Sequence, residues 1–169
     1  LSELRKEIIP SRFEKAQQPE KNTIQIGLRT LKRLVWLEIS WNAEAPRIVT
    51  VNPPEKKGEQ STLAKQLHYG LRHMALIEIE QKEFERIISL KFAIRPGESV
   101  DKQLIIELMG RHSNILLLDK ENKVITIGKQ IREKQSRIRP IGTGDFYIPP
   151  PCLKGYKPSI SESYSHWKN

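Results

Sequence analysis

The chain has 169 residues, of which 37% are hydrophobic, and a formal net charge of +9 at pH 7. This length suits one domain that buries a real core, and no run approaches the roughly 20 apolar residues of a membrane-spanning helix. The basic balance favours a polyanionic partner, with RNA and DNA ahead of a membrane surface and simple solubility as the alternative explanation.

The cysteine and histidine content argues against a structural zinc site. Cys152 is the only cysteine and the four histidines show no ligand spacing, so neither a metal nor a cofactor is predicted. The first ten residues carry four charges among their apolar positions, which is unlike a signal peptide. We therefore expect a reducing compartment, the cytoplasm, and no membrane association.

The first half of the chain predicts helix, strands and helix in turn. Amphipathic spacing indicates a short helix that stops at Pro10, and from residue 11 to 52 the apolar period falls to two. Four short runs separated by turn residues are typical of an antiparallel meander. Ser61 is expected to cap a second helix that continues to about Ala75. Glycine inside a helix costs about 1 kcal/mol relative to alanine, so we expect close packing at Gly70.

Further apolar runs predict more strands in the second half. They cover residues 76–81, 87–94, 104–109, 115–118 and 124–127. The whole pattern indicates an α+β fold, an antiparallel β-sandwich or partly open barrel of about eight or nine strands with two flanking helices. Residues 1–151 are expected to form this domain. Residues 152–169 show no periodicity and are predicted to be a linker or exit segment.

The segment between two of these strands carries most of the polar chemistry. It consists of Gly110, Arg111, His112, Ser113 and Asn114. Gly110 and Asn114 tolerate the positive φ of a tight connection, and Arg111 can fork onto a phosphate while the next three residues add donors. The alternative is a solvated loop whose Ser and Asn side chains bond their own backbone.

A basic run is the second candidate for anion binding. Its five cations, opposed only by Glu133, are Lys129, Arg132, Lys134, Arg137 and Arg139. Such a run suits contact with a phosphate backbone rather than recognition of bases, and a solvated charged face explains it equally well. No P-loop, GxGxxG, GxSxG or HExxH motif occurs, so the sequence does not predict an enzyme.

Several motifs occur in the order in which a known family has them. They are Glu-Leu-Met-Gly-Arg-His-Ser-Asn-Ile-Leu-Leu-Leu-Asp at residues 107–119, Gln18-Pro19, Leu71-Arg72-His73, and Ser136-Arg137-Ile138-Arg139-Pro140. With these motifs the sequence resembles the amino-terminal domain of the NFACT family, bacterial members of which were long labelled fibronectin- or fibrinogen-binding proteins. The resemblance covers most of the chain.

The resemblance implies a fold similar to the amino-terminal β-sandwich of formamidopyrimidine-DNA glycosylases. It also implies a function, because family members bind obstructed large ribosomal subunits with stalled peptidyl-tRNA and help recruit tRNA for alanine tailing of the nascent chain. Where the family commonly has Asp-Arg, a pair implicated in tRNA engagement, this chain has Glu85 and Arg86. Residues 85–86, 111–114 and the basic run are accordingly expected to contact tRNA or ribosomal RNA.

Two other functions stay open at this point. The old family label suggests a surface adhesin for extracellular-matrix protein. Fold analogy suggests a nucleic-acid-processing enzyme, although analogy of fold is weak evidence for chemistry. Glycosylases of the related fold use an amino-terminal proline as nucleophile, whereas this chain starts with Leu1, so base excision is disfavoured.

Overall fold

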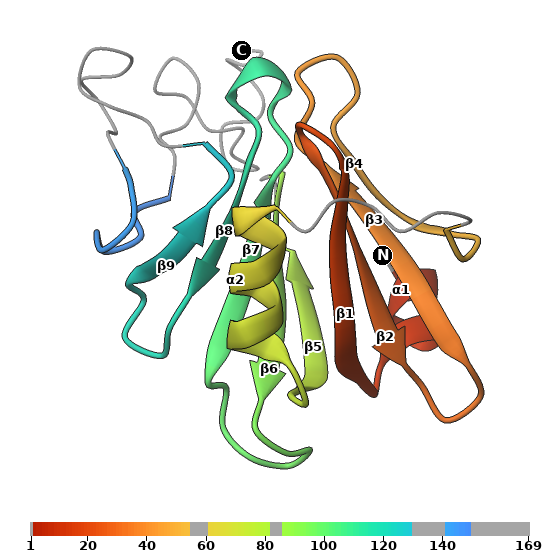
Figure 1. Cartoon of the computed structure of the whole chain (residues 1–169). Coiled ribbons are helices and arrows are strands. Elements are labelled where there is room, and N and C mark those ends of the chain that lie inside the picture. The colour runs from red at the N-terminus through yellow and green to blue at the C-terminus, as the bar shows by residue number, and fades with distance from the viewer. Residues whose placement is uncertain (1, 55–60, 82–85, 130–140, 150–169) are drawn as a thin grey trace, which may run out of the picture.

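The computed structural model describes residues 2–54, 61–81, 86–129 and 141–149 (Figure 1). Within these ranges nine strands form one antiparallel sheet in the order β4-β3-β2-β1-β5-β6-β7-β8-β9, and the sheet stays open because β4 and β9 lie at its two edges. The expected antiparallel α+β arrangement with two helices is confirmed. The likeness to glycosylases stays a prediction, and the predicted linker, residues 152–169, lies outside the described residues.

The order of elements follows the sequence pattern closely. The first part contains α1 (Ser2–Ile8), β1 (Ser11–Glu20), β2 (Thr23–Arg29), β3 (Leu34–Ser40) and β4 (Arg47–Val51). The second part contains α2 (Thr62–Leu71), β5 (Ala75–Gln81), β6 (Ile87–Ala93), β7 (Lys102–Glu107), β8 (Asn114–Leu118) and β9 (Val124–Ile127). A short 3-10 turn, η1 (Gly110–His112), connects β7 to β8.

The sheet divides into two halves where β1 meets β5. These two strands share only two residue pairs, at the start of each strand. Farther along β5 a side chain of α1 contacts the strand, because the Arg5 guanidinium donates to the Ile79 carbonyl at 2.7 and 3.0 Å. Figure 1 shows β1–β4 and β5–β9 lying at an angle to each other on the two sides of this junction.

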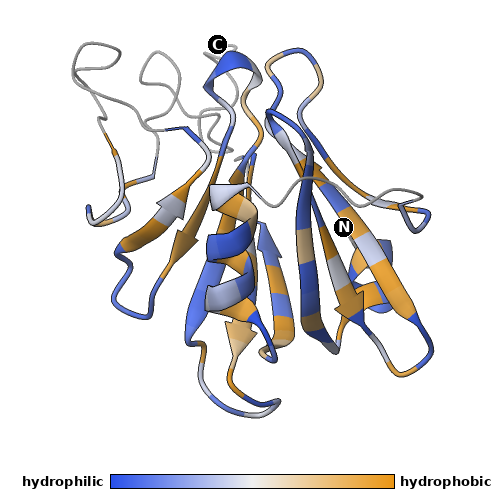
Figure 2. Cartoon of the chain, in the orientation of Figure 1, coloured by the Kyte–Doolittle hydropathy of each residue, from blue (hydrophilic) through white to orange (hydrophobic). Residues whose placement is uncertain are grey.

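The main hydrophobic core draws on both halves of the sheet and on both helices. Phe13 of β1 and Phe92 of β6 meet edge to face across the junction, with ring centroids 6.3 Å apart. Figure 2 shows the hydrophobic residues concentrated along the strands and the hydrophilic ones at turns and on the visible side of α2. Burying one such aromatic or aliphatic side chain contributes about 1.5–3 kcal/mol, so this shared core holds the two halves together.

Helix α2 lies over the core and contacts β1 and β9. The Ser61 hydroxyl accepts the Ala64 amide at 3.1 Å, which confirms the expected cap. The helix ends at Leu71, four residues before the predicted end, because the chain turns at His73 with a φ of 66°. A Cβ added to Gly70 would lie 2.9 Å from a methyl group of Leu117, so the close packing expected there is confirmed.

A second, smaller cluster covers the other face of β6–β9. Its buried members are Ile87, Ile105, Leu116, Leu118, Val124, Ile127 and Ile141. Tyr147 packs against this cluster, and its hydroxyl donates to the buried carboxylate of Glu107 at 2.7 Å. The segment of residues 141–149 therefore closes this face, next to the end of β7 that leads into η1.

Candidate nucleic-acid interface

The connection between β7 and β8 is a compact turn rather than an open loop. Gly110 has a φ of 58°, so the positive φ expected at this glycine is confirmed. Two successive backbone hydrogen bonds of 3.0 Å, donated by the amides of His112 and Ser113, close the turn. In Figure 1 this turn stands at the top of the view, beyond the ends of β7 and β8.

Two of the four polar side chains predicted to contact RNA here are fully buried. The Ser113 hydroxyl accepts the Met109 amide at 2.8 Å. The Asn114 carboxamide donates to the Lys129 carbonyl at 2.9 Å and accepts the amide of the same residue at 3.0 Å. It also accepts the amide of Ile115 at 2.9 Å. Because neither side chain reaches the surface, we reassign Ser113 and Asn114 from RNA contact to support of the backbone.

The backbone of Asn114 also differs from the prediction. It is the first residue of β8 rather than a turn residue, and the residues other than glycine with positive φ in the described part of the chain are His73 and Asn122. Asn114 pairs with Glu107 across the β7–β8 ladder. Its contribution to the turn is therefore made by its side chain, which ties the start of β8 to the end of β9.

Basic residues from three separate segments meet at this end of the sheet. Arg111 and His112 of η1 are exposed. Arg86, just before β6, is also exposed, and its carbonyl accepts the Leu108 amide at 2.9 Å. Lys129, just after β9, donates from Nζ to the Arg111 carbonyl at 2.8 Å. We call Arg86, Arg111, His112 and Lys129 the basic end.

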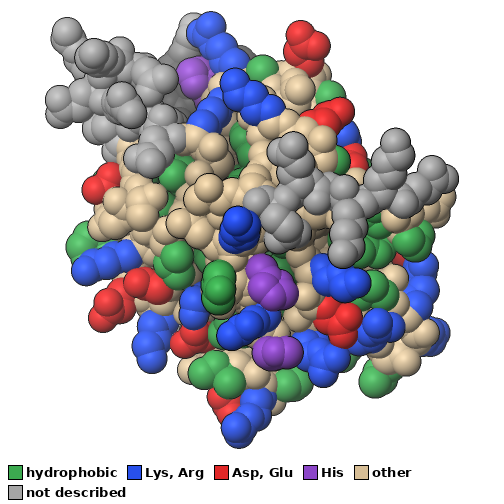
Figure 3. Space-filling model, in the orientation of Figure 1, with side chains coloured by type: hydrophobic (Ala, Val, Ile, Leu, Met, Phe, Trp, Pro, Cys, Tyr) green, Lys and Arg blue, Asp and Glu red, His purple; other side chains and the backbone are tan. Residues whose placement is uncertain are grey.

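The electrostatics of the basic end suit an anion. Among the ion pairs between described residues, none involves a member of the basic end. Burial against the turn lowers the pKa of Lys129, whereas arginine keeps its charge at every physiological pH. Figure 3 shows Lys or Arg side chains and a His gathered at the top of the view, where Figure 1 places η1. Arg86 and Arg111 are therefore the stronger contact candidates, and Lys129 supports the turn.

The remaining site residues predicted from the sequence lie outside the described part of the chain. They are Glu85, Arg132, Lys134, Arg137 and Arg139. Lys129, the first cation of the basic run, lies at the basic end. The role of Lys129 in holding η1 was missed from the sequence, because its partners are fifteen and eighteen residues away in the chain.

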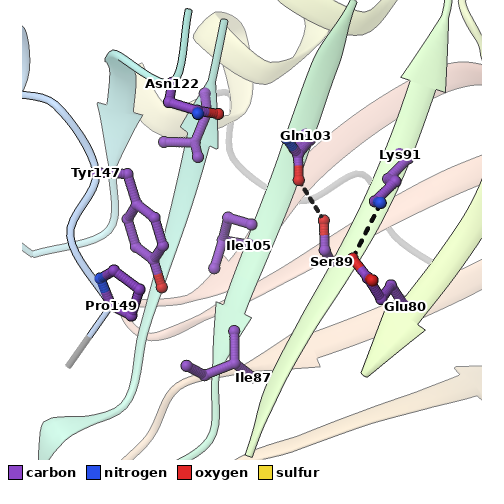
Figure 4. A pocket seen from close by; sticks show the side chains of 10 residues that line it. Glu80, Ile87, Ser89, Lys91, Gln103, Ile105, Asn122, Tyr147 and Pro149 are labelled. Atoms are coloured by element: carbon purple, nitrogen blue, oxygen red, sulfur yellow. Dashed lines mark hydrogen bonds and ion pairs between the residues drawn. The ribbon is translucent and has the colours of Figure 1, made fainter. Parts of the chain in front are cut away.

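The cavity on the other face of β5–β8 is a weaker candidate site. It measures about 370 Å³ and has Ile105 and Tyr147 among its lining residues. Four of its polar side chains pair with each other (Figure 4): Ser89 donates to Gln103 at 2.8 Å, and Lys91 lies 3.0 Å from Glu80. The described residues contain no group of three His, Cys, Asp or Glu side chains that could hold a metal ion. Nor does any helix among them have the length and apolar character needed to cross a bilayer.

These features define the class of protein: an open α+β domain of nine described strands with a basic end. The chain belongs to the NFACT family, because the family model described as NFACT N-terminal and middle domains matches residues 1–169. The Rqc2 homolog RqcH of Streptococcus pneumoniae is 31% identical over 162 residues, which are 94% of this chain and 29% of that protein. The Rqc2 homolog RqcH of Bacillus subtilis is 28% identical over 160 residues, with 92% and 28% covered. The chain thus spans less than a third of these curated relatives.

Solved structures with the same fold carry a different label. The crystal structure of the N-terminal domain of fibronectin-binding protein PavA from Streptococcus pneumoniae matches with a TM-score of 0.80 and 30% identity, covering 89% of this chain and 58% of that chain. The fibrinogen binding protein from Staphylococcus aureus matches with a TM-score of 0.74 and 22% identity, covering 88% and 53%. The second likeness concerns the fold alone.

Proposed function

We propose that this chain is the RNA-binding module of a ribosome-associated quality-control factor. In this proposal it acts in the cytoplasm, where it contacts tRNA and a large ribosomal subunit that carries a stalled peptidyl-tRNA. It supports alanine tailing at the carboxyl end of the nascent chain and is not itself an enzyme. Membership of the NFACT family and the relatives named RqcH support the proposal.

The meeting of Arg86, Arg111 and His112 at the basic end carries this proposal. The first precedes β6 and the other two follow β7, so the strand pairing of β6 with β7 fixes their relative positions. Guanidinium groups bind phosphate oxygens through paired donors, and contacts of this kind position a nucleic-acid backbone without reading bases. Two guanidinium groups at one end of the sheet can therefore contact the same phosphate backbone.

The proposal assigns a separate role to each part of the interface. Arg86 and Arg111 contact phosphates, and His112 adds a donor beside them. Lys129 and the buried Ser113 and Asn114 hold η1 in place. We keep Glu85 and the cations of the basic run beyond Lys129 as further RNA contacts, on the strength of the sequence alone.

The proposal is tested by measuring tRNA binding of the variant Arg86→Ala/Arg111→Ala in gel shifts across a salt series. Loss of two phosphate contacts should weaken binding at least about tenfold, since a hydrogen bond to a charged group contributes about 1.5–3 kcal/mol. It should also reduce the salt dependence by about 1.5 log units of affinity per log unit of salt. The control is Lys21→Ala/Lys32→Ala, which removes the same charge at two exposed turns. Normal binding by the arginine variant contradicts the site.

A surface adhesin is the second candidate, because similar solved structures are named fibronectin- and fibrinogen-binding proteins. Fractionation of intact cells separates the two functions. If the protein is found only in the cytosol with ribosomes, the result contradicts the adhesin function. Protein found on the cell surface, together with binding of the purified chain to immobilised fibronectin, would favour the adhesin over the RNA-binding module.

A further inference from the structure

Helix α2 presents a second basic surface, distinct from the basic end. The side of the helix that faces the core is made by Ala64, Leu67 and Leu71. Lys65, Tyr69 and Arg72 follow at a spacing of four and three residues, which places them together on the opposite side. All three are exposed, and Tyr69 keeps 73% of its surface accessible. We call these three residues the α2 ridge.

The positive charge of the α2 ridge is not balanced by acidic residues of α2 itself. No acidic residue occurs between Ser61 and Met74. Neither Lys65 nor Arg72 takes part in an ion pair with another described residue. Figure 3 shows Lys, Arg and His side chains gathered over the helix in the middle of the view. A polyanion can therefore approach the helix without meeting a carboxylate of α2.

The aromatic member of the ridge is placed for contact rather than for packing. The guanidinium carbon of Arg72 lies 5.5 Å from the centroid of the Tyr69 ring. This cation–π contact orients the arginine and reduces the freedom that it loses when it binds a phosphate. Since most of the Tyr69 side chain faces solvent, the core does not account for a large aromatic residue at this position.

The ridge is also held firmly against the sheet. The helix packs closely on Leu117 of β8 at Gly70. The Thr126 hydroxyl of β9 donates to the Gln66 carboxamide and ties the helix to the sheet edge. Seven residues separate Lys65 from Arg72, a rise of about 10 Å. A span of this length lets Lys65 and Arg72 contact different phosphates of the same backbone strand.

We propose that the α2 ridge binds the phosphate backbone of a duplex segment of RNA, as a second contact surface beside the basic end. This inference rests on the proposed function for the class of partner. Lys65 and Arg72 each neutralise one phosphate, and Tyr69 packs against the sugar-phosphate chain while it orients Arg72. These contacts do not involve base edges, so they are independent of sequence.

Fluorescence anisotropy with a tRNA transcript, a short RNA duplex and a single-stranded RNA of the same length tests the ridge. The variants are Lys65→Ala/Arg72→Ala, Tyr69→Ala, Arg86→Ala/Arg111→Ala, and the control Lys21→Ala/Lys32→Ala. The ridge double variant should lower the salt dependence of duplex binding by about 1.8 log units per log unit of salt. The control should leave the salt dependence unchanged, and Tyr69→Ala should weaken duplex binding several-fold. Unchanged duplex binding by the ridge double variant overturns the inference.

The same measurement separates this inference from the proposed function. If only the Arg86→Ala/Arg111→Ala variant loses binding, the result supports the basic end as a contact and contradicts the ridge. If only the Lys65→Ala/Arg72→Ala variant loses binding, the result supports the ridge and contradicts the basic end. If the unsubstituted chain binds none of the RNAs, both are overturned. Thermal unfolding of each variant checks that the fold is intact, which is expected because the substituted side chains are exposed.

Discussion

Asn114 offers the sharpest test of how the basic end is built, through the substitution Asn114→Ala. The side chain is fully buried and makes three hydrogen bonds, two of them with the backbone of Lys129 and one with the Ile115 amide. Alanine leaves these backbone groups without their partner, and an unsatisfied buried group costs about 1–3 kcal/mol. Lys129 is only half-buried, so water can replace part of the loss. We expect the free energy of unfolding to fall by about 2–4 kcal/mol.

Equilibrium urea unfolding at neutral pH measures this change, with thermal unfolding as a second probe. A loss of this size corresponds to a fall in Tm of roughly 4–15 °C for a chain of this length. The matched control is Asn52→Ala, which removes the same group from an exposed position after β4 and should be nearly neutral. A change in Asn114→Ala of less than about 0.5 kcal/mol would refute the role of this side chain as a clamp.

A second substitution, Asn114→Asp, separates the donor from the acceptor. The carboxylate keeps the acceptor for the Lys129 amide but faces the Lys129 carbonyl with no hydrogen to donate. Burial should raise the pKa of the new Asp above its value in the unfolded chain. The folded state then binds more protons between the two pKa values, so stability should increase as the pH falls through this window. A loss of stability that does not change with pH would contradict the role of the Asn114 carboxamide as a buried donor.

The other predictions concern the frame around the site. Gly70→Ala gains up to about 1 kcal/mol of helix propensity, but its Cβ presses against Leu117 at an overpacking cost of about 1–3 kcal/mol. Urea unfolding should therefore show a net loss of stability. A stabilised variant would contradict the close packing at this position. Burial raises the pKa of Glu38, but hydrogen bonds from Gln25 and Arg47 outweigh burial and lower that pKa below its ordinary value. Glu38→Gln should lower the free energy of unfolding by about 0.5–1 kcal/mol at neutral pH. This loss should shrink as the pH falls through the lowered pKa, because Glu38 of the unsubstituted chain then becomes protonated. A loss of stability that stays constant with pH would contradict the ion pair.

Local chemistry made much of the fold predictable from the sequence. Alternating apolar runs and turn residues located the strands, and the hydroxyl of Ser61 marked the start of α2. The predicted end of that helix was four residues late, because Met74 continues the apolar spacing although the backbone has already turned at His73. The pairing of β1 with β5 was not predictable, since two residue pairs between strands far apart in the chain leave no local pattern.

The candidate site was predictable only in part, for a similar reason. Gly110 was identified correctly because glycine alone adopts a positive φ at no cost. Asn114 was assigned to the same kind of turn, and its actual role depends on Lys129, fifteen residues farther along the chain. Residue type alone does not show that Arg111 is exposed and Ser113 is buried, because the direction of each side chain follows from the backbone of the η1 turn.

The central claim, that the basic end contacts RNA, is tested most directly by site-specific photocrosslinking from position 112. A photoreactive aromatic amino acid replaces His112, an exposed residue of η1, and in a control protein it replaces Leu31, which is 97% exposed in the turn between β2 and β3. Each protein is irradiated with tRNA and the covalent adducts are quantified. We expect an abundant adduct from position 112 and little from position 31. Equal yields from the two positions, or an adduct from position 31 alone, would contradict the claim.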